Sequence, residues 1–323
     1  MRSGSLSLDA FLARRATDRR LARLTHDIPL PEARGLEFGP ADNPTALPEG
    51  LRVAFVNHAQ DADAALPGAV PIDHAWAGSG SLVEAIGPEV VREGFDFAIA
   101  AQVGQYVPNL LGWFRGIHAA LRPGGVLNLS LPDRRFMFDA GRPESGIAEL
   151  VEADLLAYTR PSPRQIFAHT HGALAIGPEA IWAGDDPVTA PRLCGEAALA
   201  LAHAQAREAD TYRNCHCWVF TPLSFLDAVE AAARLGLFPF VLNRIAATEP
   251  GGFEFYVSMR RDADANPAGL AHLQEGRGRP PARHPPAPAA HGAAPRRPVR
   301  GRAQAALRGA ARLERAFPSA FAS

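Results

Sequence analysis

Charged side chains crowd one short stretch of the sequence, PDRRFMFDAGRP at residues 132–143. A carboxylate beside a reacting group can act as a general base, and an arginine can hold an acidic or hydroxylated substrate through paired hydrogen bonds. An Arg–Asp pair can also serve only to fix a loop. We predict Asp133 and Asp139 as candidate catalytic residues and Arg134, Arg135 and Arg142 as candidate substrate contacts, with one of the ion pairs structural.

A histidine provides a further candidate base. His216 lies between Cys215 and Cys217, and its imidazole titrates near neutrality, so it could take a proton from an attacking hydroxyl. A hydrogen-bonded core histidine is the alternative interpretation. His169 and His171 add further metal-binding atoms, but the zinc spacings C-x₂₋₄-C and H-x₃₋₅-H are missing. We therefore predict no metal site.

Residues 95–131 are predicted to form the structural unit that positions the charged stretch. An apolar run at 95–101 is followed by an amphipathic stretch at 109–121, a Gly-Gly turn and a second apolar run at 126–131. This order is typical of a β-α-β unit in a parallel sheet. Gln102 and Asp133 follow the two strands directly, at the carboxyl edge where such sheets bind ligands.

The remaining elements extend this unit into an α/β fold. Further strands are predicted at 34–38, 52–56 and 70–72, and helices at 81–86 and from a Thr221 cap to about 235. Two last strands, at 238–246 and 253–259, flank a Gly-Gly turn that suits an antiparallel hairpin. The prediction is a central, mostly parallel sheet of seven strands with an antiparallel edge hairpin.

We divide the chain into four parts. Residues 1–30 form an N-terminal amphipathic helix, with Leu8, Phe11, Leu12, Leu21 and Leu24 as candidates for its buried side. Residues 31–261 form the α/β domain. Its insert at 134–214, with helices at 147–158 and 194–209, is expected to form a lid or substrate pocket. Residues 262–323, rich in Ala, Pro and Arg, are predicted to be disordered, with a basic helix possible at 302–317.

Composition excludes several classes of function. All 33 basic residues are arginine, which rules out a Schiff-base lysine and a P-loop lysine. Three cysteines do not make a disulfide framework, so we expect a reduced, cytoplasmic protein. No apolar run approaches the roughly 18 residues of a membrane span.

Residues 261–323 carry 11 arginines against 4 acids. Since aromatics are not interleaved with them, we predict a solvated tail, with attachment to nucleic acid or to a membrane surface as the alternative.

Several motifs resemble those of the class I S-adenosylmethionine-dependent methyltransferases. These are LEFGP at 36–40, FDFAIA at 95–100 and LRPGG at 121–125. The strings PDRRFMFDAGRP at 132–143 and HCWVFTPLSF at 216–225 are similar to those of a narrower bacterial group. That group is often associated with glycosyltransferases and cell-surface polysaccharides. The resemblance covers roughly residues 30–260.

The resemblance implies a Rossmann-like fold and S-adenosyl-L-methionine as the cofactor. A glycine turn lets the backbone approach the cofactor closely, while the acid in LEFGP meets its positive sulfonium and amino end. The residues after the second and third strands face the ribose hydroxyls and the adenine amino group. The cofactor contacts predicted in this way are Glu37, Gly39, Pro40, Asn57, His58, Asp73, Ala101 and Gln102.

The chain departs from the narrower group at two places, which keeps two functions open. It reads AQVGQYVPN at 101–109 where the group reads SHVIEHVPD, and Asn57 replaces an acid after the second strand. The first hypothesis is an enzyme that methylates an oxygen of a small molecule or glycan. The alternative is a catalytically degenerate accessory or binding protein of the same fold. The LEFGP and PDRRFMFDAGRP motifs favour the enzyme, and the sequence indicates no particular oligomeric state.

Overall fold

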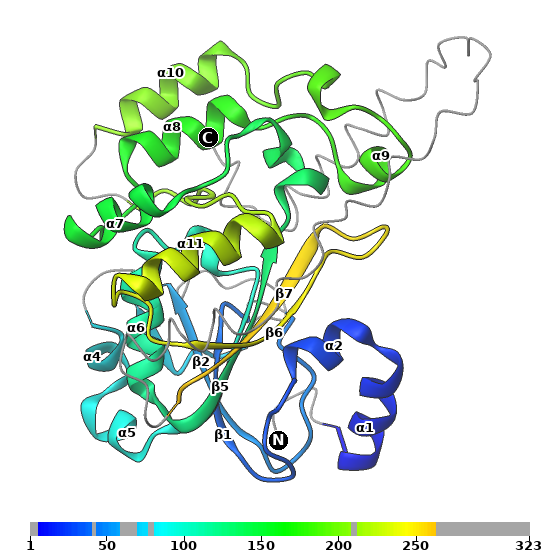
Figure 1. Cartoon of the computed structure of the whole chain (residues 1–323), viewed down its shortest axis with the longest axis vertical. Helices are drawn as coiled ribbons and strands as arrows, with labels where there is room; N and C mark the ends of the chain where they lie inside the picture. The colour runs from blue at the N-terminus through cyan, green and yellow to red at the C-terminus, as the bar shows by residue number, and fades with distance from the viewer. Residues whose placement is uncertain (1–5, 41–42, 59–69, 77–80, 208–211, 263–323) are drawn as a thin grey trace.

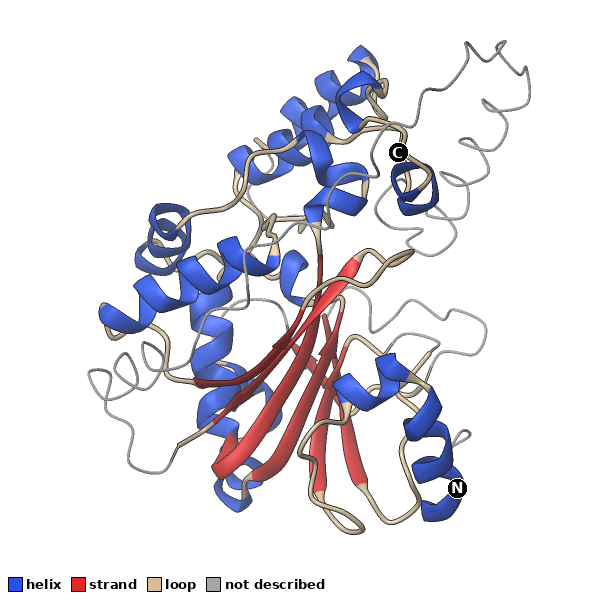
Figure 2. Ribbon diagram, turned by 45° about the vertical axis from the view of Figure 1, so that its right-hand side comes forward, coloured by secondary structure: helices blue, strands red, loops and turns tan. Residues whose placement is uncertain are grey.

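The computed structural model describes residues 6–40, 43–58, 70–76, 81–207 and 212–262. A twisted sheet forms the centre of the molecule, with helices on both of its faces and a helical cap over one end (Figure 1, Figure 2). The predicted tail at 262–323 and its basic helix lie, apart from residue 262, outside the described residues. Among the described residues, none of the helices combines the length and hydrophobicity that a bilayer span requires.

The sheet has seven strands in the order β3-β2-β1-β4-β5-β7-β6. They are β1 Arg34–Phe38, β2 Arg52–His58, β3 His74–Trp76, β4 Phe95–Ala101, β5 Leu121–Pro132, β6 Val241–Ala246 and β7 Glu254–Arg260. The first five strands are parallel, while β7 pairs antiparallel with both β5 and β6. The predicted mostly parallel sheet with an antiparallel edge hairpin is confirmed.

The helices form two layers and a cap. They are α1 Leu8–Thr17, α2 Arg19–Leu24, α4 Leu82–Ile86, α5 Pro88–Glu93, α6 Leu110–Ala120, α7 Ile147–Leu155, α8 Pro163–Gly172, α9 Pro178–Trp182, α10 Glu196–Gln205 and α11 Pro222–Arg234. Helices α4, α5, α6 and α11 cover one face, and α1 and α2 cover the other (Figure 1). Helices α7 to α10 form the cap, and all of them belong to the insert at 134–214.

Side chains of β4 alternate between the two faces, as a strand requires. Ala98 and Ala100 pack with α6 in the larger core, while Phe97 and Ile99 pack with Phe11 of α1 in the smaller one. Strand β4 is therefore buried on both faces, which explains its continuous apolar sequence.

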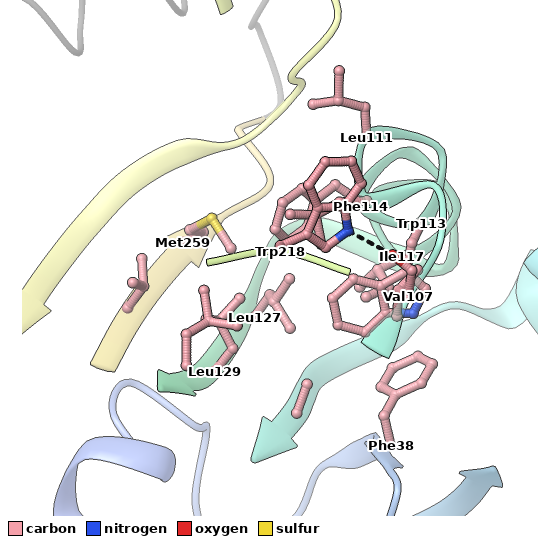
Figure 3. Packing of buried hydrophobic residues seen from close by; sticks show 14 of the residues in the cluster. Phe38, Val107, Leu111, Trp113, Phe114, Ile117, Leu127, Leu129, Trp218 and Met259 are labelled. Atoms are coloured by element: carbon pink, nitrogen blue, oxygen red, sulfur yellow. Dashed lines mark hydrogen bonds between the residues drawn. The ribbon is translucent and has the colours of Figure 1, made fainter. Parts of the chain in front are cut away.

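Two caps explain where the helices beside the site begin. The Asn109 side chain accepts a hydrogen bond from Gly112 N at 2.8 Å, and Thr221 accepts one from Ser224 N at 3.2 Å. The larger core joins these helices through Trp218, whose indole N–H donates to the Val107 carbonyl at 2.6 Å (Figure 3). Trp218 is 1% exposed, so this bond satisfies a polar group that burial would otherwise penalise.

The structure corrects three predictions made from local pattern. The third strand is His74–Trp76 rather than 70–72. The N-terminal helix is two helices, because the Asp18 side chain caps a second one by accepting from Leu21 N. Leu12 is 44% exposed rather than buried, whereas Phe11, Leu21 and Leu24 are buried as predicted.

Candidate active site

The carboxyl ends of β1 and β4 form the topological switch point of the sheet. The two strands are neighbours, but the chain leaves β1 towards β2 on one side and returns to β4 on the other. Such a point is where open α/β sheets bind ligands. Gly39 follows β1 with φ of 60°, and a Cβ there would lie 2.8 Å from the Val103 side chain. Glycine is required at this turn by conformation and by space.

Glu37 is a buried carboxylate at the end of β1. It is 3% exposed, and its Oε1 accepts from Thr45 N at 2.7 Å. Its Oε2 is buried with no hydrogen-bond partner among the described residues. Burial raises the pKa of Glu37 to about 7, although the bond from Thr45 opposes this. An acid in this state is suited to receive a cationic group, which would restore its charge.

A large cavity adjoins Glu37. It measures about 1190 Å³ and runs along β1 and β2 beneath α2, with Glu37, Thr45, Phe55 and Asp73 among its lining residues. Among the described residues, the connection from β1 to β2 contains no helix. Parallel strands are usually joined by a helix that covers the sheet, whereas here residues 43–48 of the extended connection line the cavity.

Asn57 and His58, predicted to follow the second strand, are the last two residues of β2, and they make local contacts. The Asn57 side chain accepts from His58 N at 2.9 Å. The His58 ring stacks on Tyr212, with centroids 4.0 Å apart, and the Tyr212 hydroxyl donates to the Tyr106 carbonyl at 3.1 Å. Tyr212 therefore links the end of β2 to the loop after β4, across the end of β1. Tyr212 lies in a part of the insert without a clear hydrophobic pattern, so the sequence did not predict this contact.

Asp73 was predicted as an adenine contact because it would follow a third strand at 70–72, but that strand lies at 74–76. Asp73 precedes β3 instead of following it, and its carboxylate accepts from Phe55 N at 2.8 Å. It therefore lies beside the middle of β2, away from the carboxyl edge where an adenine contact was expected, although it lines the cavity near Glu37.

Gln102 directly follows β4 in a left-handed conformation with φ of 59°. Its Nε2 donates to Glu254 Oε2 at 3.0 Å, and its own carbonyl accepts from Gln105 Nε2 at 2.9 Å. Ala101 and Pro40, the other predicted contacts here, are apolar: Ala101 packs in the smaller core and Pro40 is buried. The Gln102 side chain therefore points towards the β6–β7 hairpin.

Asp133 has a structural position rather than the predicted catalytic one. It is fully buried, and its two oxygens accept from Arg135 Nε at 2.9 Å, Arg135 Nη2 at 2.6 Å and the Thr248 hydroxyl at 2.7 Å. These bonds engage both oxygens and tie the end of β5 to the turn before β7. This is the structural Arg–Asp pair that the sequence led us to expect.

Asp139 and His216 meet across the end of the sheet. Asp133 forms a bridge with Phe220, so residues 215–221 run beside the chain that leaves β5. His216 Nδ1 lies 2.5 Å from Asp139 Oδ2, and Arg142 Nη1 lies 2.7 Å from Asp139 Oδ1. Although burial disfavours the carboxylate, His216 and Arg142 hold the pKa of Asp139 well below its usual range.

Two residues that the sequence did not single out as a pair complete this cluster. Tyr106 Oη lies 3.1 Å from His216 Nε2, and the His216 backbone N–H donates to His169 Nδ1 at 3.3 Å. Burial, and then the neighbouring His216, lower the pKa of His169 to about 3, so His169 is neutral at physiological pH. The sequence drew attention to His169 only as a possible metal ligand, and Tyr106 only as a departure from a motif.

The three arginines serve different purposes. Arg142 is 4% exposed and also donates to the His216 carbonyl at 2.9 Å, so it is a buried structural cation rather than a substrate contact. Arg134 donates to the Ala140 carbonyl at 2.6 Å. Arg135 is half-buried and lies over the Phe136 ring at 5.2 Å. In the part of the chain that the structure describes, histidines, cysteines and acids form no cluster of three or more suited to a metal ion.

The fold and this site define a class of protein. A sheet ordered β3-β2-β1-β4-β5-β7-β6, with a glycine turn and a buried acid at its switch point, is that of a class I S-adenosylmethionine-dependent methyltransferase. A family model described as a methyltransferase domain matches residues 10–232. The chain belongs to this family, and it is a transferase that uses S-adenosylmethionine.

Solved structures with a similar fold include several proteins with the same description. An S-adenosylmethionine-dependent methyltransferase from Mesorhizobium loti is 14% identical over 75% of this chain and 96% of its own, with a TM-score of 0.33. A putative one from Listeria monocytogenes is 10% identical over 76% and 97%, also with 0.33. A possible histamine N-methyltransferase from Thermotoga maritima is 12% identical over 79% and 94%, with 0.31. Comparison with curated proteins gives no match.

The residues at the switch point fit such a cofactor. S-adenosylmethionine carries a positively charged sulfonium and an amino group. A buried carboxylate oxygen that makes no other bond can stabilise this positive charge. Glu37 Oε2, which has no hydrogen-bond partner in the described part of the chain, is such an oxygen. Gly39 brings the backbone to the same edge without a side chain. These two residues would hold the positive end of the cofactor.

Proposed function

We propose that this protein transfers a methyl group to an oxygen of a small molecule or glycan. The observation that carries the proposal is the buried Asp139–His216 pair at the carboxyl edge of the sheet. A hydroxyl must lose its proton as it attacks a methyl group, and a positioned base accelerates this step by about 10²–10⁴-fold. The pair supplies the base that the reaction needs.

The chain's own residues divide the work. S-adenosylmethionine supplies the methyl group and takes up the electron pair of the broken sulfur–carbon bond. Glu37 balances the positive charge of the bound cofactor. Asp139 orients the His216 ring and stabilises it once protonated, as a carboxylate does in other acid–base pairs. Arg142 and the His169 ring fix Asp139 and the His216 backbone, so the pair is held before substrate arrives.

An aromatic pair that includes Phe136, three residues before Asp139 in the chain, favours a ring-shaped acceptor. Trp182 stacks on Phe136 with centroids 4.3 Å apart and planes 7° apart, and the Arg135 guanidinium lies over the same ring of Phe136. The three groups are half-buried. Sugar rings pack well on such faces because their C–H groups meet the negative face of the aromatic ring. This supports a glycan acceptor and, with the resemblance, a role in cell-surface polysaccharide synthesis.

The insert at 134–214 would then serve as the wall of the acceptor site. It contributes Asp139, Arg142 and His169 to the cluster around His216. We place the reaction in a reduced compartment such as the cytoplasm. This is consistent with the state of the cysteines, since Cys194, Cys215 and Cys217 are all free thiols.

Calorimetric titration with S-adenosylmethionine and S-adenosylhomocysteine tests the cofactor site. We expect micromolar binding to the full chain, weakened at least tenfold by Glu37→Ala. Glu49→Ala, an exposed acid of the same connection, is the matched control and should leave binding unchanged. Absence of binding at millimolar ligand would contradict the assignment and favour an accessory protein that keeps only the fold.

Methyl transfer itself is tested with methyl-labelled S-adenosylmethionine and a panel of acceptors. The panel contains monosaccharide glycosides, phenols and hydroxy acids, with primary amines as the comparison class. We expect label on a hydroxylated acceptor, and its loss in His216→Gln. Label on amines alone would show that the acceptor atom is nitrogen.

A further inference from the structure

A chain of hydrogen bonds leads from the interior towards the surface at this site. It runs from Asp139 Oδ2 to His216 Nδ1 over 2.5 Å, and from His216 Nε2 to the Tyr106 hydroxyl over 3.1 Å. Asp139 is 1% and His216 3% exposed, whereas Tyr106 is only half-buried. A substrate oxygen reaches a half-buried phenol more readily than an imidazole that the protein encloses.

The position of the protons along this chain follows from its partners. Asp139 is ionised because His216 and Arg142 both stabilise its charge, so its oxygens only accept hydrogen bonds. The proton between Asp139 and His216 therefore belongs to Nδ1. In the neutral ring this leaves Nε2 with its lone pair, which accepts the hydrogen bond from Tyr106. The relay is thus arranged to draw a proton from the tyrosine inwards.

Packing holds the ring in this orientation. Phe138 and Tyr106 each contact the His216 ring with centroids 4.9 Å apart, and His169 Nδ1 accepts from the His216 backbone. These contacts fix the plane of the imidazole as well as its position. A ring flip, which would exchange its two nitrogens, would break the bonds to Asp139 and Tyr106 and is opposed by the two packed rings.

The backbone of Tyr106 is fixed as well. The Gln105 carbonyl accepts from Cys217 N at 2.7 Å, and the Trp218 indole donates to the Val107 carbonyl at 2.6 Å (Figure 3). Residues on both sides of Tyr106 are thus bonded to residues next to His216. The two side chains keep their relative position because their chain segments are joined.

We propose that Tyr106 is the catalytic residue that meets the acceptor hydroxyl and relays its proton to His216. The inference rests on the proposed O-methyl transfer and names the group that touches the acceptor. The acceptor O–H bond breaks and its proton moves to Tyr106 Oη, while the Tyr106 proton moves to His216 Nε2. The acceptor oxygen uses its freed electron pair to form the bond to the methyl carbon, and the sulfur–carbon bond breaks with its pair left on sulfur. The proton remains on the His216–Asp139 pair until solvent removes it.

The charged and titratable groups around the relay are consistent with its direction. Asp139 attracts the proton that His216 gains, and Arg142 balances Asp139 on its other oxygen. His169 is neutral, and burial raises the pKa of the Cys217 thiol well above its usual value, so it is neutral as well. The positive charge gained on proton transfer is therefore carried by His216, beside the Asp139 carboxylate.

The first test requires no acceptor. In the full chain labelled with ¹⁵N-histidine, the His216 resonances are assigned by comparison with His216→Gln. We expect Nδ1 to be protonated and Nε2 to carry the shift of an unprotonated, hydrogen-bonded nitrogen, and Tyr106→Phe to move the Nε2 resonance alone. Tyr158→Phe, which removes a hydroxyl bonded to Glu152 at 3.2 Å, is the control that leaves both unchanged. A proton on Nε2, or an Nε2 shift unaffected by Tyr106→Phe, would overturn the relay.

The second test uses methyl transfer to the hydroxylated panel at saturating S-adenosylmethionine. We expect Tyr106→Phe to lower kcat about 100-fold, as His216→Gln does, with cofactor affinity within twofold of the original. The double variant should be no slower than either single one, because the two residues act as a unit. Loss of activity in His216→Gln with full activity in Tyr106→Phe would refute the relay while leaving the proposed function intact. Full activity in both variants would refute the proposed base itself.

Discussion

Gln102 Nε2 lies 3.0 Å from Glu254 Oε2, which joins the end of a parallel strand to the antiparallel hairpin 152 residues later. Glu254 also accepts from Arg20 of α2 at 2.9 Å and from the Tyr256 hydroxyl. Burial opposes ionisation of Glu254, but Arg20, Tyr256 and Gln102 together lower its pKa. One carboxylate thus connects the N-terminal helices, the hairpin and the cofactor edge of the sheet.

Replacing Gln102 tests how much this connection stabilises. Gln102→Ala should lower the free energy of unfolding by about 1–3 kcal/mol, because the charged, half-buried acceptor Glu254 loses a donor. Alanine also retains the cost of a left-handed residue, about 1–2 kcal/mol, which glycine does not have. Gln102→Gly should therefore be more stable than Gln102→Ala in urea unfolding. An alanine variant as stable as the glycine variant would show that the left-handed conformation is not kept.

Glu37 should destabilise the fold at neutral pH. Its pKa is about 7 in the folded protein against 4.5 for the free side chain, so the folded state binds the proton more tightly. The free energy of unfolding therefore falls as pH rises from 4.5 through 7, by up to about 3 kcal/mol. Glu37→Gln should remove this dependence and raise the melting temperature at pH 8. Glu49→Gln is the exposed control, and a Glu37→Gln variant less stable than the original at pH 8 would contradict the assignment.

The same carboxyl should make cofactor binding depend on pH. A cation binds the ionised form of Glu37, and about nine-tenths of the group is ionised at pH 8 but only about one-tenth at pH 6, given its pKa of about 7. The affinity for S-adenosylmethionine should fall about tenfold between these pH values. Comparison with Glu37→Gln cancels the titration of the cofactor itself. Equal pH profiles for both proteins would exclude Glu37 from the contact.

The fold could be predicted because most of its elements are marked locally. Strands β1 and β4 were predicted with the correct ends because each is a short apolar run bounded by turn residues. Strand β3 was misplaced because HAW at 74–76 has only three residues and no apolar run. Its position is set by pairing with β2, which lies outside any local window.

The site was predictable in its members but not in its contacts. Asp139 and His216 were recognised by residue type, whereas their meeting depends on how residues 215–221 lie against the end of β5. Asp133 looked equally suited to catalysis, and only the bonds from Arg135 and Thr248 show that its oxygens are engaged. Tyr106 gave no signal of its own, because its role follows from the position of His216.

Asp139→Asn separates the structural and chemical roles of the buried cluster. The substitution leaves Arg142, which is 4% exposed, without its buried counter-charge. Breaking a buried ion pair in this way costs about 3–5 kcal/mol, so we expect a loss of this size in urea unfolding at pH 7.

Because the folded pKa of Asp139 is lowered, its stabilising effect is present above the usual aspartate pKa of about 4 and is lost as pH falls below it. The difference between Asp139→Asn and the original protein should therefore shrink in acid. Asp9→Asn, at an exposed helix position, is the control with little effect at either pH. A difference that is constant from pH 7 to pH 3 would show that Asp139 is not the carboxylate that holds Arg142 and His216 together.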